Sequence, residues 1–287
     1  MTEKACAKLN ISLDVLSKRG DGYHDIRMVM QSVTLCDDVQ VSLRGDGGVT
    51  VSTDLRFLPG DDRNIAVKAA RAFFSQLGET GLGADIAIHK RIPVCAGMGG
   101  GSSDGAAVLR ALNTLTGKPF SRKELERTGA ALGSDIPFCV AGGTALAEGR
   151  GEALTELPAF PDCRFVIAKP SFSVSTPELF SRIDLTAVKY HPDTAGLLAA
   201  LSRGNLAGIS HRMYNVFEDA LTQKHSEIAA IKSALLDCGA LGAAMTGTGS
   251  AVFGIFDSVK RAETAQSALS RHYGEVFLAA PRPAVLI

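Results

Sequence analysis

The sequence contains no tryptophan, and aromatic residues make up only 6% of its 287 positions. It also lacks an excess of either charge, because 30 lysines and arginines stand against 30 aspartates and glutamates. A protein whose main partner is nucleic acid or an anionic membrane surface carries a basic surplus, so we predict neither partner. No apolar run reaches the roughly 20 residues of a membrane-spanning helix.

Cysteine is scarce and scattered. The six cysteines include no Cys-x-x-Cys pair, and most lie in apolar runs, where cysteine behaves as a small hydrophobic residue. We therefore expect neither a zinc ribbon nor a disulfide framework. The histidines show no ligand spacing, so no metal site built by the protein is predicted. The first residues lead directly into a strand pattern without the hydrophobic region of a signal peptide, which predicts a cytoplasmic protein.

Apolar residues make up 46% of the chain, and at this length two domains are the natural expectation. Pro158 and Pro161 mark the predicted boundary, which gives domains 1–157 and 158–287. Strands and helices mix in both halves without a regular strand–helix–strand repeat, which predicts an α+β fold. We expect two strands at 28–35 and 39–43, a strand or hairpin at 138–147, and a helix at 209–221.

Four glycines, Gly97, Gly99, Gly100 and Gly101, fall within five positions and precede an apolar helical pattern. Glycine lets the backbone reach positive φ, and a capped helix start offers free N–H groups to an anion. We expect the cap to be one of the polar residues 102–104. The stretch fits neither a Walker A loop nor a dinucleotide fingerprint. A phosphate-binding loop and a flexible loop without a ligand both remain open at this point.

Two charged residues are candidates for catalysis. Lys8 lies in a predicted strand between apolar neighbours, which suits either a paired buried lysine or a lysine on an edge strand. Asp135 lies in a tight loop before an apolar run, where it serves either as a helix cap or as a base for a hydroxyl nucleophile.

Two further turns carry ligand-binding residue types. Tyr23 and His24 follow the first strand, and their rings suit either stacking on a base or a plain surface turn. Residues 246–250, Thr-Gly-Thr-Gly-Ser, form a second glycine-rich turn in the other half of the chain. Two such turns in different halves suggest a ligand held between the domains, although a plain loop before a strand is the alternative.

Taken together, these stretches resemble the GHMP kinases (galacto-, homoserine, mevalonate and phosphomevalonate kinases). Residues 93–103 look like the glycine-rich phosphate motif of that family, and residues 245–250 resemble its C-terminal glycine motif. Residues 7–13, 19–24 and 133–138 look like the branch whose substrate carries cytidine diphosphate. The resemblance covers nearly the whole chain. Met98 and Gly105 depart from the family pattern, where leucine and alanine are usual.

The resemblance implies a two-domain fold, with an N-terminal domain like ribosomal protein S5 domain 2 and a ferredoxin-like C-terminal domain. It implies that ATP phosphorylates the 2-hydroxyl of the small molecule 4-diphosphocytidyl-2-C-methyl-D-erythritol. Magnesium would be held mainly by phosphates and water, with Ser103 as the nominated protein oxygen. The sequence sets no oligomeric state.

The resemblance also assigns roles to individual residues. Asp135 would be the general base, and Lys8 its electrostatic partner. The residues assigned to ATP are Pro93, Val94, Cys95, Ala96, Gly97, Met98, Gly99, Gly100, Gly101, Ser102, Ser103 and Asn64. Those assigned to the acceptor are Asn10, Tyr23, His24, Thr176 and Phe180. Two alternatives stay open: a kinase of mevalonate, homoserine or a sugar, and a nucleotide-binding sensor without catalysis.

Overall fold

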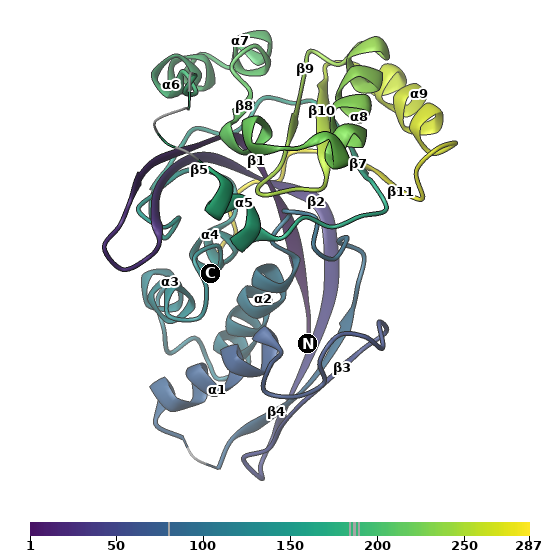
Figure 1. Cartoon of the computed structure of the whole chain (residues 1–287). Coiled ribbons are helices and arrows are strands. Elements are labelled where there is room, and N and C mark those ends of the chain that lie inside the picture. The colour runs from purple at the N-terminus through teal and green to yellow at the C-terminus, as the bar shows by residue number, and fades with distance from the viewer. Residues whose placement is uncertain (80, 184, 186–187, 189) are drawn as a thin grey trace.

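Two long antiparallel strands, β1 (Thr2–Lys18) and β2 (His24–Arg44), run through the first half of the protein (Figure 1). The computed structural model describes residues 1–287 except 80, 184, 186–187 and 189. The sheet built on this pair has the order β3-β4-β2-β1-β8, and β5 and β6 extend it from β2. Its other strands are β3 (Val49–Thr53), β4 (Gly83–His89), β5 (Thr144–Glu148), β6 (Ala153–Glu156) and β8 (Tyr214–Asn215).

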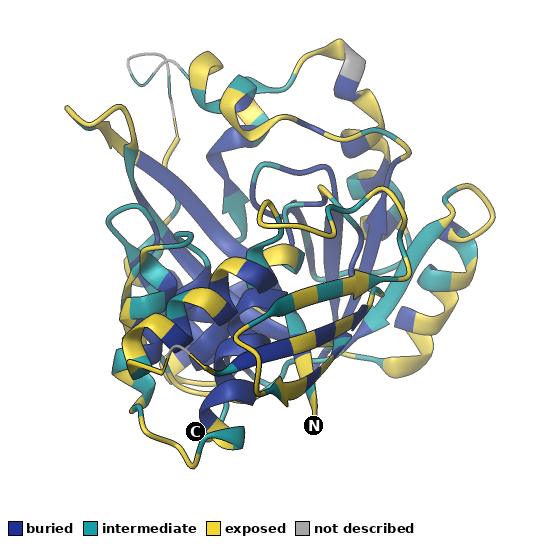
Figure 2. Cartoon of the chain, turned by 90° about the horizontal axis from the view of Figure 1, so that it is seen from below, coloured by how far each residue is buried: buried dark blue, intermediate teal, exposed yellow. Residues whose placement is uncertain are grey.

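Helices cover one face of this sheet. Alternate residues of β4 are buried, as expected of a strand with one face on a core. Phe73 and Leu109 are fully buried between that face and the helices. Figure 2 shows the buried segments gathered inside, with exposed helix faces turned outward. The covering helices are α1 (Ile65–Leu77), α2 (Gly100–Leu115), α3 (Arg122–Ala130) and α4 (Ile136–Ala141).

A second sheet, wholly antiparallel, has the order β11-β7-β10-β9. Phe165 and Phe253 from this sheet share a core cluster with Leu9 and Ile11 of β1. Among the described helices, none is long and apolar enough to cross a membrane. The strands are β7 (Arg164–Lys169), β9 (Gly242–Met245), β10 (Val252–Phe256) and β11 (Glu275–Ala279). The helices are α5 (Thr176–Arg182), α6 (Thr194–Ser202), α7 (Leu206–Ser210), α8 (Ser226–Asp237) and α9 (Val259–Leu269).

The two sheets and their helices confirm the predicted α+β class. The chain passes from the first sheet to the second between β6 and β7, and the boundary at 157 and 158 stays a prediction. Later segments return to the first sheet: β8 pairs in parallel with β1, and Pro281 and Ala284 form bridges with Val33 and Gly142.

Two element predictions are wrong, and a third is wrong in part. Residues 138–141 form the end of helix α4 rather than a strand, because Pro137 starts a helix readily and Gly142 and Gly143 end it at positive φ, whereas residues 144–147 lie in strand β5. Residues 28–43 form one strand rather than two. Residues 209–221 are divided among the end of α7, β8 and a 3-10 helix (Val216–Ala220).

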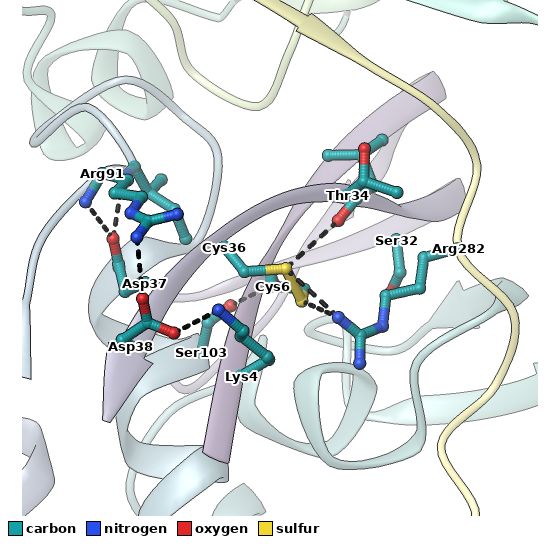
Figure 3. Close-up of a disulfide and its surroundings, with 12 residues drawn as sticks. Lys4, Cys6, Ser32, Thr34, Cys36, Asp37, Asp38, Arg91, Ser103 and Arg282 are labelled. Carbon is teal, nitrogen blue, oxygen red and sulfur yellow. Dashed lines mark hydrogen bonds and ion pairs between the residues drawn. A yellow bond between two sulfur atoms is a disulfide. The ribbon is translucent and has the colours of Figure 1, made fainter. Parts of the chain in front are cut away.

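The structure also pairs Cys6 with Cys36 in a disulfide, although the sequence predicts no disulfide framework. The two residues stand directly opposite each other on β1 and β2, and residue spacing in the sequence does not reveal that register. Arg282 lies beside both sulfur atoms, with its Nη1 2.8 Å from Cys6 Sγ (Figure 3).

Candidate active site

A cavity of 1210 Å³ opens between the two halves of the chain, and both halves line it. The first half contributes β1, the turn after it and the glycine-rich loop. The second half contributes α5 and the second glycine-rich turn. The predicted site residues on its wall are Lys8, Tyr23, His24, Cys95, Gly97, Gly99, Ser102, Asp135, Thr176 and Phe180.

Lys8 and Asp135 meet on the wall of this cavity. Lys8 Nζ lies 3.8 Å from Asp135 Oδ2 and donates a hydrogen bond of 2.7 Å to Asn10 Oδ1. The Lys8 side chain is 5% exposed, whereas that of Asp135 is 31% exposed and reaches the cavity. Because Lys8 is buried, the alternative of an exposed lysine that blunts a strand edge is wrong. The pair places a cation and an accessible carboxylate side by side.

Gly99 brings the glycine-rich loop to this pair. A Cβ at this position would lie 3.2 Å from Lys8 Cγ and 3.8 Å from Asp135 Oδ2. The loop is also tied to β1 by the Lys8 N–H, which donates to the Met98 carbonyl at 3.1 Å. Helix α2 therefore begins where the ammonium and the carboxylate meet, and a phosphate at its start would lie close to both.

The cap of α2 differs from the prediction. Its N-cap is Gly99 at φ 69°, without a side-chain cap, rather than a polar residue from 102–104. Ser102 lines the cavity. Ser103 is 1% exposed, and its hydroxyl donates to the Cys6 carbonyl at 2.6 Å. The nomination of Ser103 as a magnesium ligand is therefore wrong, because this hydroxyl is turned into the fold.

A buried lysine, Lys90, lies between two carboxylates next to the glycine-rich loop. Lys90 Nζ lies 2.5 Å from Asp37 Oδ2 and 2.6 Å from Asp104 Oδ2, and Asp37 Oδ1 also accepts from the backbone N–H of Ile92. The chain entering the loop is thus tied to the first turn of α2. The pKa of the Asp104 carboxyl is raised to about 7. Burial is the main cause, the Lys90 ammonium opposes it, and the nearby Asp37 carboxylate adds to the rise.

The two glycine-rich turns pack directly against each other. A Cβ at Gly97 would overlap the carbonyl oxygen of Thr246, and a Cβ at Gly247 would lie 2.8 Å from the Gly97 oxygen. The Thr246 hydroxyl accepts from the Asn10 N–H at 3.1 Å. Asn215 Nδ2 donates to the Gly247 carbonyl at 2.8 Å. Only glycine permits this backbone approach, which joins the two halves at the cavity wall.

Aromatic side chains line the other end of the cavity. The ring centroids of His24 and Phe180 are 5.0 Å apart, and Phe180 meets Phe217 edge-on at 4.8 Å. Burial lowers the pKa of His24, and the nearby Lys18 ammonium lowers it further, so the ring is neutral at pH 7. Thr176 Oγ1 lies 2.7 Å from Thr248 Oγ1, which ties α5 to the second glycine-rich turn.

Several predicted residues stand behind the cavity wall rather than on it. Asn10 is fully buried and holds Lys8, as described above. Met98 and Ala96 belong to the core between the sheets. Asn64 is the N-cap of α1, and its Oδ1 accepts from the Ala66 N–H at 2.9 Å. The remaining predicted residues outside the described wall are Pro93, Val94, Gly100, Gly101 and Ser103.

Sequence reasoning missed two cations that line the cavity, Lys18 and Arg150. Arg150 lies in the Gly149–Gly151 turn, between β5 and β6, and its guanidinium carbon is 5.2 Å from the Tyr23 ring centroid. A basic residue between two glycines in a turn is a weak sequence signal, because nothing in it reveals that the turn faces Tyr23.

Comparison with known proteins agrees with this geometry. Residues 64–143 match the GHMP kinases N terminal domain, and residues 197–275 match the GHMP kinases C terminal domain. The 4-diphosphocytidyl-2-C-methyl-D-erythritol kinase of Alkaliphilus oremlandii (strain OhILAs) is 44% identical over 276 residues, 96% of this chain and 94% of that protein.

Solved structures show the same relationship. A crystal structure of 4-(cytidine 5'-diphospho)-2C-methyl-D-erythritol kinase has a TM-score of 0.83 at 31% identity and covers 98% of this chain and 99% of that chain. Homoserine kinase from Cytophaga hutchinsonii, at 21% identity and a TM-score of 0.76, covers 99% of this chain and 95% of its own; this likeness concerns the fold.

The chain belongs to the GHMP kinase family. Within that family its relatives at 40–44% identity over nearly the whole length are 4-diphosphocytidyl-2-C-methyl-D-erythritol kinases.

Proposed function

We propose that this protein transfers the γ-phosphoryl group of ATP to the 2-hydroxyl of 4-diphosphocytidyl-2-C-methyl-D-erythritol, giving the 2-phosphate and ADP in the methylerythritol phosphate route to isoprenoids. The observation that carries the proposal is the meeting of Lys8, Asp135 and Gly99 at one point of a cavity whose far end is aromatic. The named relatives support the choice of acceptor.

Asp135 is the proposed general base. As the acceptor oxygen forms its bond to the γ-phosphorus, the bond from that phosphorus to the bridging oxygen of ADP breaks, and the hydroxyl proton passes to Asp135. Lys8, 3.8 Å from the carboxylate, offsets charge on the transferring group. Phosphoryl transfer depends mainly on positioning and charge stabilisation, and both are available here.

Magnesium fits this site as an ion held chiefly by phosphates and water. Within the described parts of the chain, no group of three or more histidine, cysteine, aspartate or glutamate side chains could hold a metal. The Ser102 hydroxyl and the Asp135 carboxylate are oxygen donors on the cavity wall, a sparse set of the kind magnesium accepts beside ATP. Bound magnesium supplies neutralisation of the β- and γ-phosphate charges.

The opposite end of the cavity suits the cytidine diphosphate group. Tyr23, His24 and Phe180 offer rings for stacking, and His24 also offers ring nitrogens to the base edge. Lys18 adds positive charge at this end, which favours a ligand with phosphate groups. Thr176 stands between this end and the second glycine-rich turn.

The test supplies the purified protein with Mg-ATP and one acceptor at a time. With the cytidine-linked acceptor we expect stoichiometric ADP and a new phosphate monoester on the tertiary carbon, seen by ³¹P NMR. Cytidine 5'-diphosphate should inhibit competitively against this acceptor. Turnover of mevalonate, homoserine or a sugar in its place would overturn the acceptor assignment, and ATP binding without turnover of any acceptor would favour a sensor.

A further inference from the structure

Arg150 makes an unusual contact for a turn residue, because its guanidinium lies over the Tyr23 ring at 5.2 Å from the centroid. Tyr23 stands in the turn between β1 and β2, and Arg150 in the turn between β5 and β6. Both side chains line the cavity. Two hairpins thus place a cation and an aromatic ring together at the end of the cavity away from Lys8.

The turn that carries Arg150 is fixed to its surroundings. The Ile26 N–H donates to the Gly149 carbonyl at 2.7 Å, which ties this turn to β2. The Arg150 N–H donates to Glu152 Oε2 at 2.8 Å, and Glu152 Oε1 lies 3.8 Å from Arg150 Nε. The guanidinium therefore lies beside a carboxylate of its own turn and over the Tyr23 ring.

Tyr23, in contrast, is held mainly through its backbone. Its N–H donates to Asp21 Oδ1 at 3.1 Å, and its carbonyl accepts from the Arg19 N–H at 2.8 Å. The residue is 56% exposed, and in the described part of the chain Arg150 is the group stacked on its ring. The attraction between cation and ring is therefore what selects this orientation of the side chain.

We propose that Arg150 is a positioning residue, which holds the Tyr23 ring in the orientation that stacks on the base of the acceptor. This inference rests on the proposed function, since it requires a ligand whose aromatic base occupies this end of the cavity. Arg150 acts through Tyr23 rather than through the pair of Lys8 and Asp135. Its loss therefore weakens binding of the base and leaves phosphoryl transfer unchanged.

The experiment compares Arg150→Ala with Arg27→Ala, a matched control. Arg27 also pairs with an acid of this hairpin, Glu148 at 3.0 Å, but does not line the described cavity. Calorimetric titration measures affinity for cytidine and for cytidine 5'-diphosphate. We expect Arg150→Ala to weaken both by roughly the same factor of five to ten, with kcat and the KM for ATP unchanged. Arg27→Ala should bind both like the unaltered protein.

The mode of action is tested in a Tyr23→Ala background. There Arg150→Ala should cause no further loss, because the ring through which it acts is gone. Arg150→Lys should restore part of the affinity, since lysine keeps the charge but not the planar face. Equal affinity in Arg150→Ala overturns the inference, as does a loss confined to the diphosphate, which would make Arg150 a phosphate contact.

The same titrations separate this inference from the proposed function. If the unaltered protein binds cytidine 5'-diphosphate and phosphorylates the acceptor while Arg150→Ala does both equally well, this inference alone fails. If the unaltered protein binds neither cytidine ligand, the proposed function fails, and the role of Arg150 fails with it.

Discussion

Burial of the Lys8 ammonium costs solvation free energy, and its neighbours offset this cost. A lysine in the interior is tolerated when paired, and Asn10 Oδ1 at 2.7 Å together with Asp135 provides that pairing. The Asp135 carboxylate faces the cavity and is the more exposed member of the pair. At the scale of single residues, one side chain is therefore held still and the other is left accessible to an incoming hydroxyl.

Asp135→Asn should lower kcat by about 10²- to 10⁴-fold, because asparagine cannot accept the proton. The KM for ATP should stay within about threefold, since the amide keeps the shape of the side chain. Steady-state ADP release measures both, and the thermal midpoint verifies that the variant is folded. A variant that retains more than a tenth of kcat would contradict the assignment of the base.

Asp104 gives the protein a predictable response to pH. Burial is the main cause that raises the pKa of this carboxyl to about 7 in the folded state, well above the ordinary range of an aspartate. The folded protein then holds the proton more tightly than the unfolded chain, so this group lowers stability progressively as the pH rises from about 4 to 7. Asp104→Asn removes the titration and should make the thermal midpoint less dependent on pH between 5 and 8.

The control for this measurement is Asp162→Asn, since the Asp162 side chain is 91% exposed. Its thermal midpoint should follow the pH as the unaltered protein's does. If Asp104→Asn loses as much stability between pH 5 and 8 as this control, the buried carboxyl is not the group responsible.

At the scale of elements, the two glycine-rich turns depend on each other. Gly97→Ala should lower the free energy of unfolding by several kcal/mol, because its φ of 74° is strained for alanine and the new Cβ overlaps the Thr246 carbonyl. Gly101→Ala is the matched control, since a Cβ there meets nothing within 4 Å and alanine favours a helix. Denaturant unfolding without ligand compares them, and equal stability of the two variants would refute the packing argument.

Elements with local signals can be recognised in the sequence. Ser121 and Glu124 have the spacing of a capping box and form one at the start of α3, and the apolar residues of α1 recur at helical spacing. Sequence patterns predicted the wrong element where tertiary contacts determine the backbone conformation. The apolar run after Asp135 reads equally as strand or helix. Gly105 departs from the family pattern, and only the fold explains why glycine stands there. A Cβ at this position would lie 2.6 Å from Ile65 Cγ2 of α1.

The candidate site was predictable to a similar extent. The resemblance brought Lys8 and Asp135 forward, and the structure places them together. The resemblance could not show that the Ser103 side chain points into the fold. The sequence of the first helical turn is the same whether this hydroxyl faces the core or the cavity. Nor could it find Arg150, whose contact with Tyr23 depends on the packing of two hairpins.

At the scale of the whole molecule, the C-terminal tail fastens the second half of the chain to the first sheet. The Arg282 N–H donates to the Ser32 carbonyl at 2.8 Å, and the Val285 N–H to the Ala141 carbonyl at 2.8 Å. Ile287 packs against the core beneath the helices. The tail therefore contributes to stability although it lies far from the catalytic pair.

Deleting residues 281–287 should lower the free energy of unfolding by about 2–4 kcal/mol, from lost hydrogen bonds and apolar burial. The KM for ATP of the folded fraction should be unchanged. Thermal and denaturant unfolding measure the loss, and removal of Leu286 and Ile287 alone should cost less. A tail whose complete removal leaves the midpoint unchanged would show that the bridges to Val33 and Gly142 add no stability.

The contact between Gly97 and Thr246 also bears on how the protein acquires activity during synthesis. The two residues are 149 positions apart in the sequence. Both glycine-rich turns line the cavity, one from each half of the chain. A nascent chain that has emerged only as far as β7 already contains Lys8, Asp135 and the phosphate loop, yet nothing closes that loop from the other side. The cavity wall is therefore completed late in synthesis, once the second glycine-rich turn has been added.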